Sequence, residues 1–86
     1  MINRIINITS TGGWNAVDLP WKTRLVSVQA RTNVDCQVRF RTNEAETWTV
    51  KAGTVHTFTG SFNDTDMQIF AALGIIIEVE ATNYGL

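Results

Sequence analysis

The 86-residue sequence is poor in cysteine, proline and histidine, with one of each, and it has no marked excess of charge. The single cysteine, Cys36, excludes a disulfide within the chain, so we expect folding in a reducing compartment. The formal net charge of -1 excludes the basic surface that nucleic-acid binding needs. Long apolar runs are also missing, so we expect no membrane span and no secretory signal. These absences favour synthesis in the cytosol, with neither nucleic acid nor membrane as a partner.

The same scarcity leaves few residues for catalysis or metal binding. His56 would have to serve any base role alone, and Cys36 alternates with apolar residues, as a small buried side chain would. A zinc site needs several Cys or His ligands. Residues 63–66 place oxygen ligands at calcium-like spacing, but the glycine and later glutamate of an EF-hand loop are missing, which favours an Asx turn. We therefore predict a protein that is not an enzyme, with no catalytic residue, no metal and no cofactor.

Alternation of apolar and polar residues recurs along the chain, whereas helical periodicity is almost absent. Turn residues arrive about every 8–12 positions, which is typical of a sandwich or barrel. We predict an all-β domain over residues 1–86, a small antiparallel β-sandwich or jelly-roll-like barrel of about eight strands. The expected strands cover residues 2–8, 14–19, 23–31, 35–41, 47–51, 54–59, 67–71 and 75–81. Pro20 is expected to stop the second strand, and residues 42–46 and 60–66 are expected to be loops.

The alternation also assigns faces and one strand pair. Residues 23–31 and 35–41 have the pattern of a hairpin, with Cys36, Val38 and Phe40 facing inward and Arg39 facing water. The strand after Gly74 begins Ile-Ile-Ile and is apolar on both faces. Such a strand needs cover on both sides, from a second sheet or from a neighbouring subunit.

Three tryptophans are many for so short a chain. Trp14 and Trp21 flank the bend at residues 18–20, whereas Trp48 alternates with Val50 as a buried side chain would. Exposed tryptophans on a β face can stack on sugar rings, with Asn15, Asp18 and Asn43 as polar contacts. Packing within the core or an interface is the alternative interpretation.

Several segments together resemble the small virion proteins of tailed bacteriophages. These segments are Gly13–Pro20 (GWNAVDLP), Val28–Arg31 (VQAR), Thr47–Thr54 (TWTVKAGT) and Ala71–Glu80 (AALGIIIEVE). The proteins they resemble are short β-sandwiches with a late Lys-Ala-Gly turn and a final strand of glycine, an apolar run and glutamate.

The resemblance implies a noncatalytic capsid decoration or cement protein, located in the virion after synthesis in the host cytoplasm. Its implied partner is the major capsid protein or another virion protein, and it implies a homo-oligomer, with a trimer favoured. A head or tail fibre component and a glycan-binding module are the alternatives. The candidate contact residues lie off the expected inward face, beyond the last strand, or among the tryptophans: Ile5, Trp14, Trp21, Leu73, Ile76, Tyr84 and Leu86.

Overall fold

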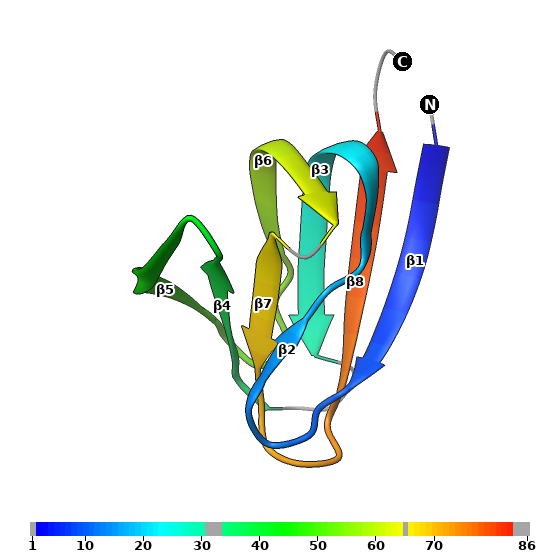
Figure 1. Cartoon of the computed structure of the whole chain (residues 1–86). Coiled ribbons are helices and arrows are strands. Elements are labelled where there is room, and N and C mark those ends of the chain that lie inside the picture. Colours follow the sequence, from blue (N-terminus) through cyan, green and yellow to red (C-terminus); the bar gives the residue numbers. More distant parts are fainter. Residues whose placement is uncertain (1, 31–33, 65, 84–86) are drawn as a thin grey trace.

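The computed structural model describes residues 2–30, 34–64 and 66–83; for positions 2, 20, 21, 64 and 83 it describes only the backbone. This part of the chain forms eight β-strands and no helix (Figure 1). They are β1 (Ile2–Thr9), β2 (Trp14–Ala16), β3 (Leu19–Ala30), β4 (Cys36–Phe40), β5 (Asn43–Val50), β6 (His56–Asp64), β7 (Met67–Phe70) and β8 (Ile76–Asn83).

The strands form two four-stranded antiparallel sheets packed as a sandwich, which confirms the predicted fold class. Sheet A has the order β1-β8-β3-β6 and sheet B the order β2-β7-β4-β5. The first strand pairs with the last, the second with the seventh, the third with the sixth and the fourth with the fifth. This pattern results when one long hairpin, with four strands in each arm, is rolled into two sheets. It is the strand order of a jelly roll.

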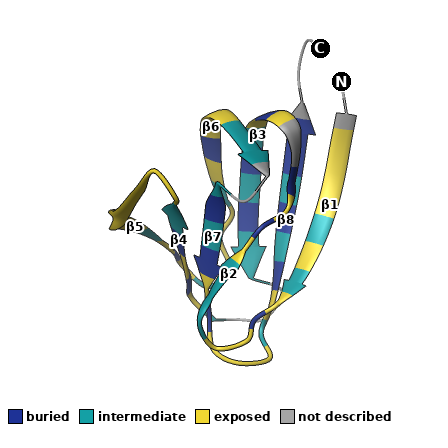
Figure 2. Ribbon diagram, viewed as in Figure 1, coloured by how far each residue is buried: buried dark blue, intermediate teal, exposed yellow. Residues whose placement is uncertain are grey.

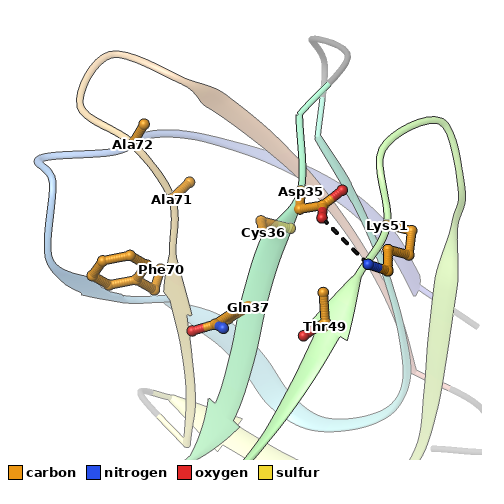
Figure 3. A pocket seen from close by; sticks show the side chains of 8 residues that line it. All are labelled: Asp35, Cys36, Gln37, Thr49, Lys51, Phe70, Ala71 and Ala72. Carbon is orange, nitrogen blue, oxygen red and sulfur yellow. Dashed lines mark ion pairs between the residues drawn. The ribbon is translucent and has the colours of Figure 1, made fainter.

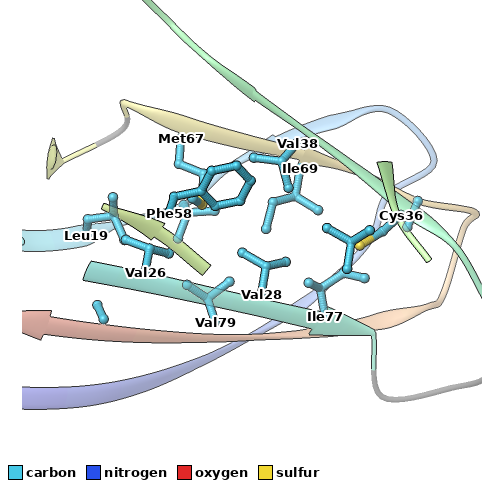
Figure 4. Close-up of a cluster of buried hydrophobic side chains, with 14 residues drawn as sticks. Leu19, Val26, Val28, Cys36, Val38, Phe58, Met67, Ile69, Ile77 and Val79 are labelled. Atoms are coloured by element: carbon cyan, nitrogen blue, oxygen red, sulfur yellow. The ribbon is translucent and has the colours of Figure 1, made fainter. Parts of the chain in front are cut away.

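The core lies between the sheets and consists of the inward residues of each alternating strand. Val26 and Val28 of β3 and Ile77 and Val79 of β8 are fully buried, as is Val38 of β4 (Figure 4). Buried and less buried positions alternate along the central strands (Figure 2). Outward neighbours such as Gln37 are exposed or half-buried, so the period-2 pattern of the sequence matches the faces of the sheets. The predicted inward side is thus confirmed for Cys36, Val38 and Phe40, of which Phe40 is half-buried against the core.

The predicted hairpin of residues 23–31 with 35–41 is wrong. β3 belongs to sheet A, where it pairs with β6 and β8, and β4 belongs to sheet B, where it pairs with β5 and β7. The connection between them therefore crosses from one sheet to the other. Alternation of apolar and polar residues fixes which face of a sheet each residue occupies, but it does not show which strand is the neighbour. The same pattern occurs whether the next strand pairs in a hairpin or belongs to the facing sheet.

Pro20 does not end a strand, because it lies inside β3. The second strand ends earlier, at Ala16, and Val17 forms a buried corner whose N–H donates to the Met67 carbonyl at 2.9 Å. Pro20 lies between the two pairs that Leu19 and Thr23 form with β6, where the register shifts, and among the described residues the pairing of β3 with β8 begins at Leu25. An irregular stretch of this kind accommodates a proline, which has no N–H to donate to a ladder. The register shifts on either side of Thr23 mark the same irregular half of β3.

Two predicted loops are strand. Residues 43–46 begin β5, which turns back directly from Phe40 and pairs with β4, and residues 60–64 complete β6 opposite the irregular half of β3. The polar composition of both segments reflects edge strands, since β5 and β6 are the last strands of their sheets. The last strand also continues two residues beyond its expected end at position 81, since β8 reaches Asn83 and Thr82 is buried.

Candidate functional site

Four connections meet at one end of the sandwich, which we call the loop end. Because successive strands run in opposite directions, the connections β1–β2, β3–β4, β5–β6 and β7–β8 all leave the sheets on the same side. In Figure 1 this end is at the bottom, opposite the two chain ends. In the described chain the three glycines with positive φ, Gly12, Gly53 and Gly74, all lie here. They permit tight turns that a residue with a Cβ would strain.

Ser10 joins two of these connections. Its N–H donates to the Ile75 carbonyl at 2.8 Å, and its carbonyl accepts from the N–H of Gly74 at 2.9 Å. Its buried hydroxyl donates to the Ala71 carbonyl at 2.7 Å and accepts from the N–H of Gly12 at 3.2 Å. The β1–β2 and β7–β8 connections are therefore held against each other by backbone and hydroxyl contacts.

Large apolar side chains are exposed around this end. The exposed fraction is 77% for Leu73, 58% for Val55, 41% for Ile76 and 37% for Phe70. Within the described residues only one other large apolar side chain is exposed, Ile5 at 59%. Fixed turns that carry exposed apolar side chains are typical of a surface that binds a protein partner.

Three of the residues predicted to make contacts lie at the loop end, although Ile76 points out of sheet A and Trp14 out of sheet B. Leu73 and Ile76 lie in or next to the β7–β8 connection, and Trp14 begins β2 immediately after the β1–β2 connection. Ile5 lies apart from them, halfway along β1 and opposite Glu80 on the outer face of sheet A. The backbone of Trp21 lies in β3 toward the other end, and its side chain is outside the described set. Tyr84 and Leu86 also lie outside the described residues.

Sequence reasoning missed two residues at this end, Phe70 and Val55. The sequence did hold a signal for Phe70. Met67 and Ile69 alternate along β7 and point inward, so the next residue, Phe70, has to point outward. For Val55 the signal was weaker, because it lies in a connection where alternation no longer applies.

Trp14 is half-buried on the outer face of sheet B and is not a free stacking platform. The guanidinium carbon of Arg39 lies 4.1 Å from its ring centroid, and the Phe70 ring lies 5.5 Å away at 54°. The Arg39 Nε also donates to Gln68 Oε1 at 2.6 Å, which holds the guanidinium in place. Arg39 therefore lies on the outer face, as predicted, but it is half-buried against Trp14 and Gln68.

The polar residues expected to accompany the tryptophan do not do so. The Asn15 side chain accepts from the Thr11 hydroxyl at 2.9 Å and donates to the Gly13 carbonyl at 2.9 Å, so it stabilises its own turn. Asn43 lies at the opposite end of the sandwich, where β5 begins, and Asp18 lies in the corner between β2 and β3.

A pocket of about 400 Å³ lies beside Phe70 (Figure 3). Strands β4, β5 and β7 and the adjoining connections supply its lining, which is Asp35, Cys36, Gln37, Thr49, Lys51, Phe70, Ala71 and Ala72. Asp35 and Lys51 form an ion pair at 3.7 Å across one side, and Asp35 also accepts from the Ala52 N–H at 2.8 Å. An aromatic ring with an amide and a hydroxyl nearby is a combination that can bind a neutral polar molecule.

The two residues considered for catalysis, Cys36 and His56, pack against other side chains. Cys36 is buried, and its pKa is raised from 9.0 to about 11 by burial and then by the charge of Asp35, so it is a thiol at neutral pH. The His56 ring lies 4.4 Å from that of Phe58. Among the described residues, no three His, Cys, Asp or Glu side chains are grouped as metal ligands.

Residues 63 and 66 close a turn, as expected for this segment, but not by the bond of an Asx turn, because the Asn63 side chain accepts from the Lys22 N–H at 2.7 Å. The Asn63 N–H donates to the Asp66 carboxylate at 3.0 Å, and the Asp66 N–H donates to the Asn63 carbonyl at 3.0 Å. Arg41 Nη2 pairs with the other carboxylate oxygen of Asp66 at 2.9 Å. Both oxygens of Asp66 are therefore engaged within the protein.

The described part of the chain has no helix long and apolar enough to cross a membrane. No protein-family model matches this sequence, and no curated protein is significantly similar to it.

Proposed function

We propose that this chain is a noncatalytic structural protein of a bacteriophage virion, a decoration protein that attaches to the capsid shell through its loop end. The observation that carries this proposal is Leu73, exposed to 77% on the β7–β8 connection that Ser10 braces, with Val55, Ile76 and Phe70 also exposed at this end of the sandwich. The sequence resemblance to small virion proteins supplies the partner, the major capsid protein. Jelly rolls occur in viral capsid domains, which agrees with this proposal by analogy of fold.

Burial of apolar surface would drive the binding of the loop end to the shell. A shell contact that buries Leu73, Ile76 and Val55 would gain about 25 cal/mol for each Å² of apolar surface removed from water. Since the turns are already fixed by hydrogen bonds, little conformational entropy is lost on binding. Many copies on one particle would add avidity to a modest contact.

The test is co-sedimentation of the recombinant chain with purified particles of the phage that encodes it, after its own copies have been stripped. We expect the chain to bind in a saturable manner, and Leu73→Asp to weaken binding by at least about tenfold, or about 1.4 kcal/mol. Ala45→Asp is the matched control, because Ala45 is exposed on β5 near the other end. Absence of binding by the unmodified chain, or equal binding by both variants, would contradict the proposal.

A second candidate function is the binding of a neutral saccharide in the pocket beside Phe70. The specific observation in its favour is the combination of the partly exposed Phe70 ring with Gln37 and Thr49 in a cavity of about 400 Å³, within the range of small-ligand sites. Jelly rolls also occur in lectin domains. In this proposal Phe70 stacks on the sugar, and Trp14 supports the Phe70 ring from the side.

A panel of monosaccharides and short oligosaccharides, followed by tryptophan fluorescence and by amide chemical shifts in NMR spectra, tests this second function. We expect shifts confined to residues 35–37, 49–51 and 70–72, and expect Phe70→Ala to abolish them. His56→Ala serves as control, because His56 lies on the inner side of sheet A. Unchanged spectra across the whole panel would exclude the saccharide site.

A further inference from the structure

The open edge of strand β1 is the longest regular edge in the described sandwich. β1 is the outermost strand of sheet A, and its eight residues pair with β8 without a register shift (Figure 1). The other three edges are blunted. β2 has three residues, β6 pairs with β3 through register shifts, and β5 carries Glu44 and Glu46 next to its own irregular pairing.

The backbone groups that face the open edge can be identified from Ser10. The Ser10 N–H points toward β8, because it donates to the Ile75 carbonyl. Since these groups alternate sides along a strand, those of Ile8, Ile6 and Arg4 also point toward β8. The N–H and C=O groups of Asn3, Ile5, Asn7 and Thr9 therefore point away from the sheet.

We propose that two copies of this chain pair antiparallel through their β1 edges, with Ile5 facing Ile5 of the second copy. Only registers that set odd residues opposite odd residues match the outward backbone groups. Centring the pair on Ile5 sets apolar against apolar and places the polar Asn3 opposite the polar Asn7 on the outer face, with the Asn3 amide held by Glu80 and Thr82 of its own copy. Ile5, 59% exposed, is the one apolar residue on that face of β1 whose side chain is described.

The two neighbouring registers, centred on Arg4 and on Ile6, are less favourable. Centring the pair on Arg4 would set two guanidinium groups directly opposite each other, which is destabilising. Centring it on Ile6 would set Ile5 against Asn7 and leave the apolar side chain against an amide. In the proposed register Arg4 lies opposite Ile6, and sheet A continues through both copies as one sheet of eight strands.

This contact is isologous and closes at two copies, so the proposal is a dimer and not the trimer favoured by the resemblance. It is independent of the loop end, since Ile5 lies apart from Leu73 and Ile76. A dimer would present two loop ends to a shell.

Sedimentation equilibrium over a wide concentration series tests the dimer. We expect a monomer–dimer equilibrium, weakened at least about tenfold by Ile5→Lys, which is about 1.4 kcal/mol. Ala45→Lys is the matched control, because Ala45 is exposed on β5 of the other sheet, away from β1, and it should dimerise like the unmodified chain. A chain that stays monomeric, a trimer, or equal effects of the two lysines would overturn the proposal.

Cross-linking checks the register without depending on the Ile5→Lys variant. Ile5→Cys, treated with a short thiol-to-thiol linker, should yield a covalent dimer, because position 5 faces itself. Thr9→Cys should not, since two residues at position 9 would lie about 27 Å apart, at about 3.4 Å for each residue along the strands. Cys36 is buried and contributes little background. Efficient linking at position 9 but not 5 would overturn the register, whereas particle binding by monomeric Ile5→Lys would leave the shell proposal standing.

Discussion

At the scale of single residues, burial decides what the few reactive side chains can do. Cys36 is 2% exposed among apolar neighbours, and its pKa is raised from 9.0 to about 11, first by burial and then by Asp35. The burial of Cys36 was predicted from the sequence, because Cys36 alternates with apolar residues such as Val38. The sequence could not predict that Arg39, on the opposite face, would cover Trp14, because that contact joins β4 to β2 across β7.

The raised pKa of Cys36 predicts how stability changes at alkaline pH. Between about pH 9 and 11 the thiol of the unfolded chain loses its proton while the folded chain retains it. The unfolded state then binds fewer protons, so the free energy of unfolding falls as the pH rises through this range. Urea unfolding at pH 8 and pH 10 should show a steeper fall for the unmodified chain than for Cys36→Ala. Parallel falls would contradict the assignment.

At the scale of strands, the aromatic cluster links the two sheets along the side formed by β5 and β6. The Phe40 ring of β4 lies 5.5 Å from Trp48, 5.3 Å from Phe58 and 5.2 Å from Phe62, which stacks on it at 16°. Trp48 also meets Phe58 edge to face at 5.8 Å. One ring of β4 thus contacts both the neighbouring edge strand of its own sheet and the edge strand of the other sheet.

Replacing this ring tests its role. We expect Phe40→Ala to lower the free energy of unfolding by about 3 kcal/mol, the lower part of the usual range for phenylalanine, because Phe40 is half-buried. Arg39→Ala should cost about 1 kcal/mol, through loss of its contact with Trp14. Denaturant unfolding of both variants gives the comparison, and similar small losses would show that the cluster contributes little.

Strand existence and facing were predictable from alternation, whereas strand pairing was not. β1, β4, β7 and β8 lie within two residues of their expected limits, and the buried valines and isoleucines lie on the expected faces. β5 and β6 were expected too short, because Glu44, Glu46, Gly60 and Asn63 have the composition of loops. A strand at a sheet edge meets water on one side and accepts such residues.

At the scale of the whole molecule, the rolled topology determines which residues gather. Leu73 and Ile76 were expected to be contact residues because they lie off the inward face, but nothing local joins them to Trp14 or Val55. The four connections meet because the chain is rolled, and rolling brings the first strand beside the last. The loop end therefore could not be assembled from sequence patterns, although most of its members could be named. Phe70 and Val55 complete it only in the folded chain.

The pairing of the first strand with the last has a practical consequence. Ile2 lies opposite Asn83, so both described ends of the chain leave the sandwich side by side, far from Leu73 and its neighbouring turns (Figure 1). Peptides fused before Ile2 and after Asn83 would project together in one direction, away from the surface that we assign to the shell. A single copy could then display two different cargoes next to each other while its turns stayed free to bind.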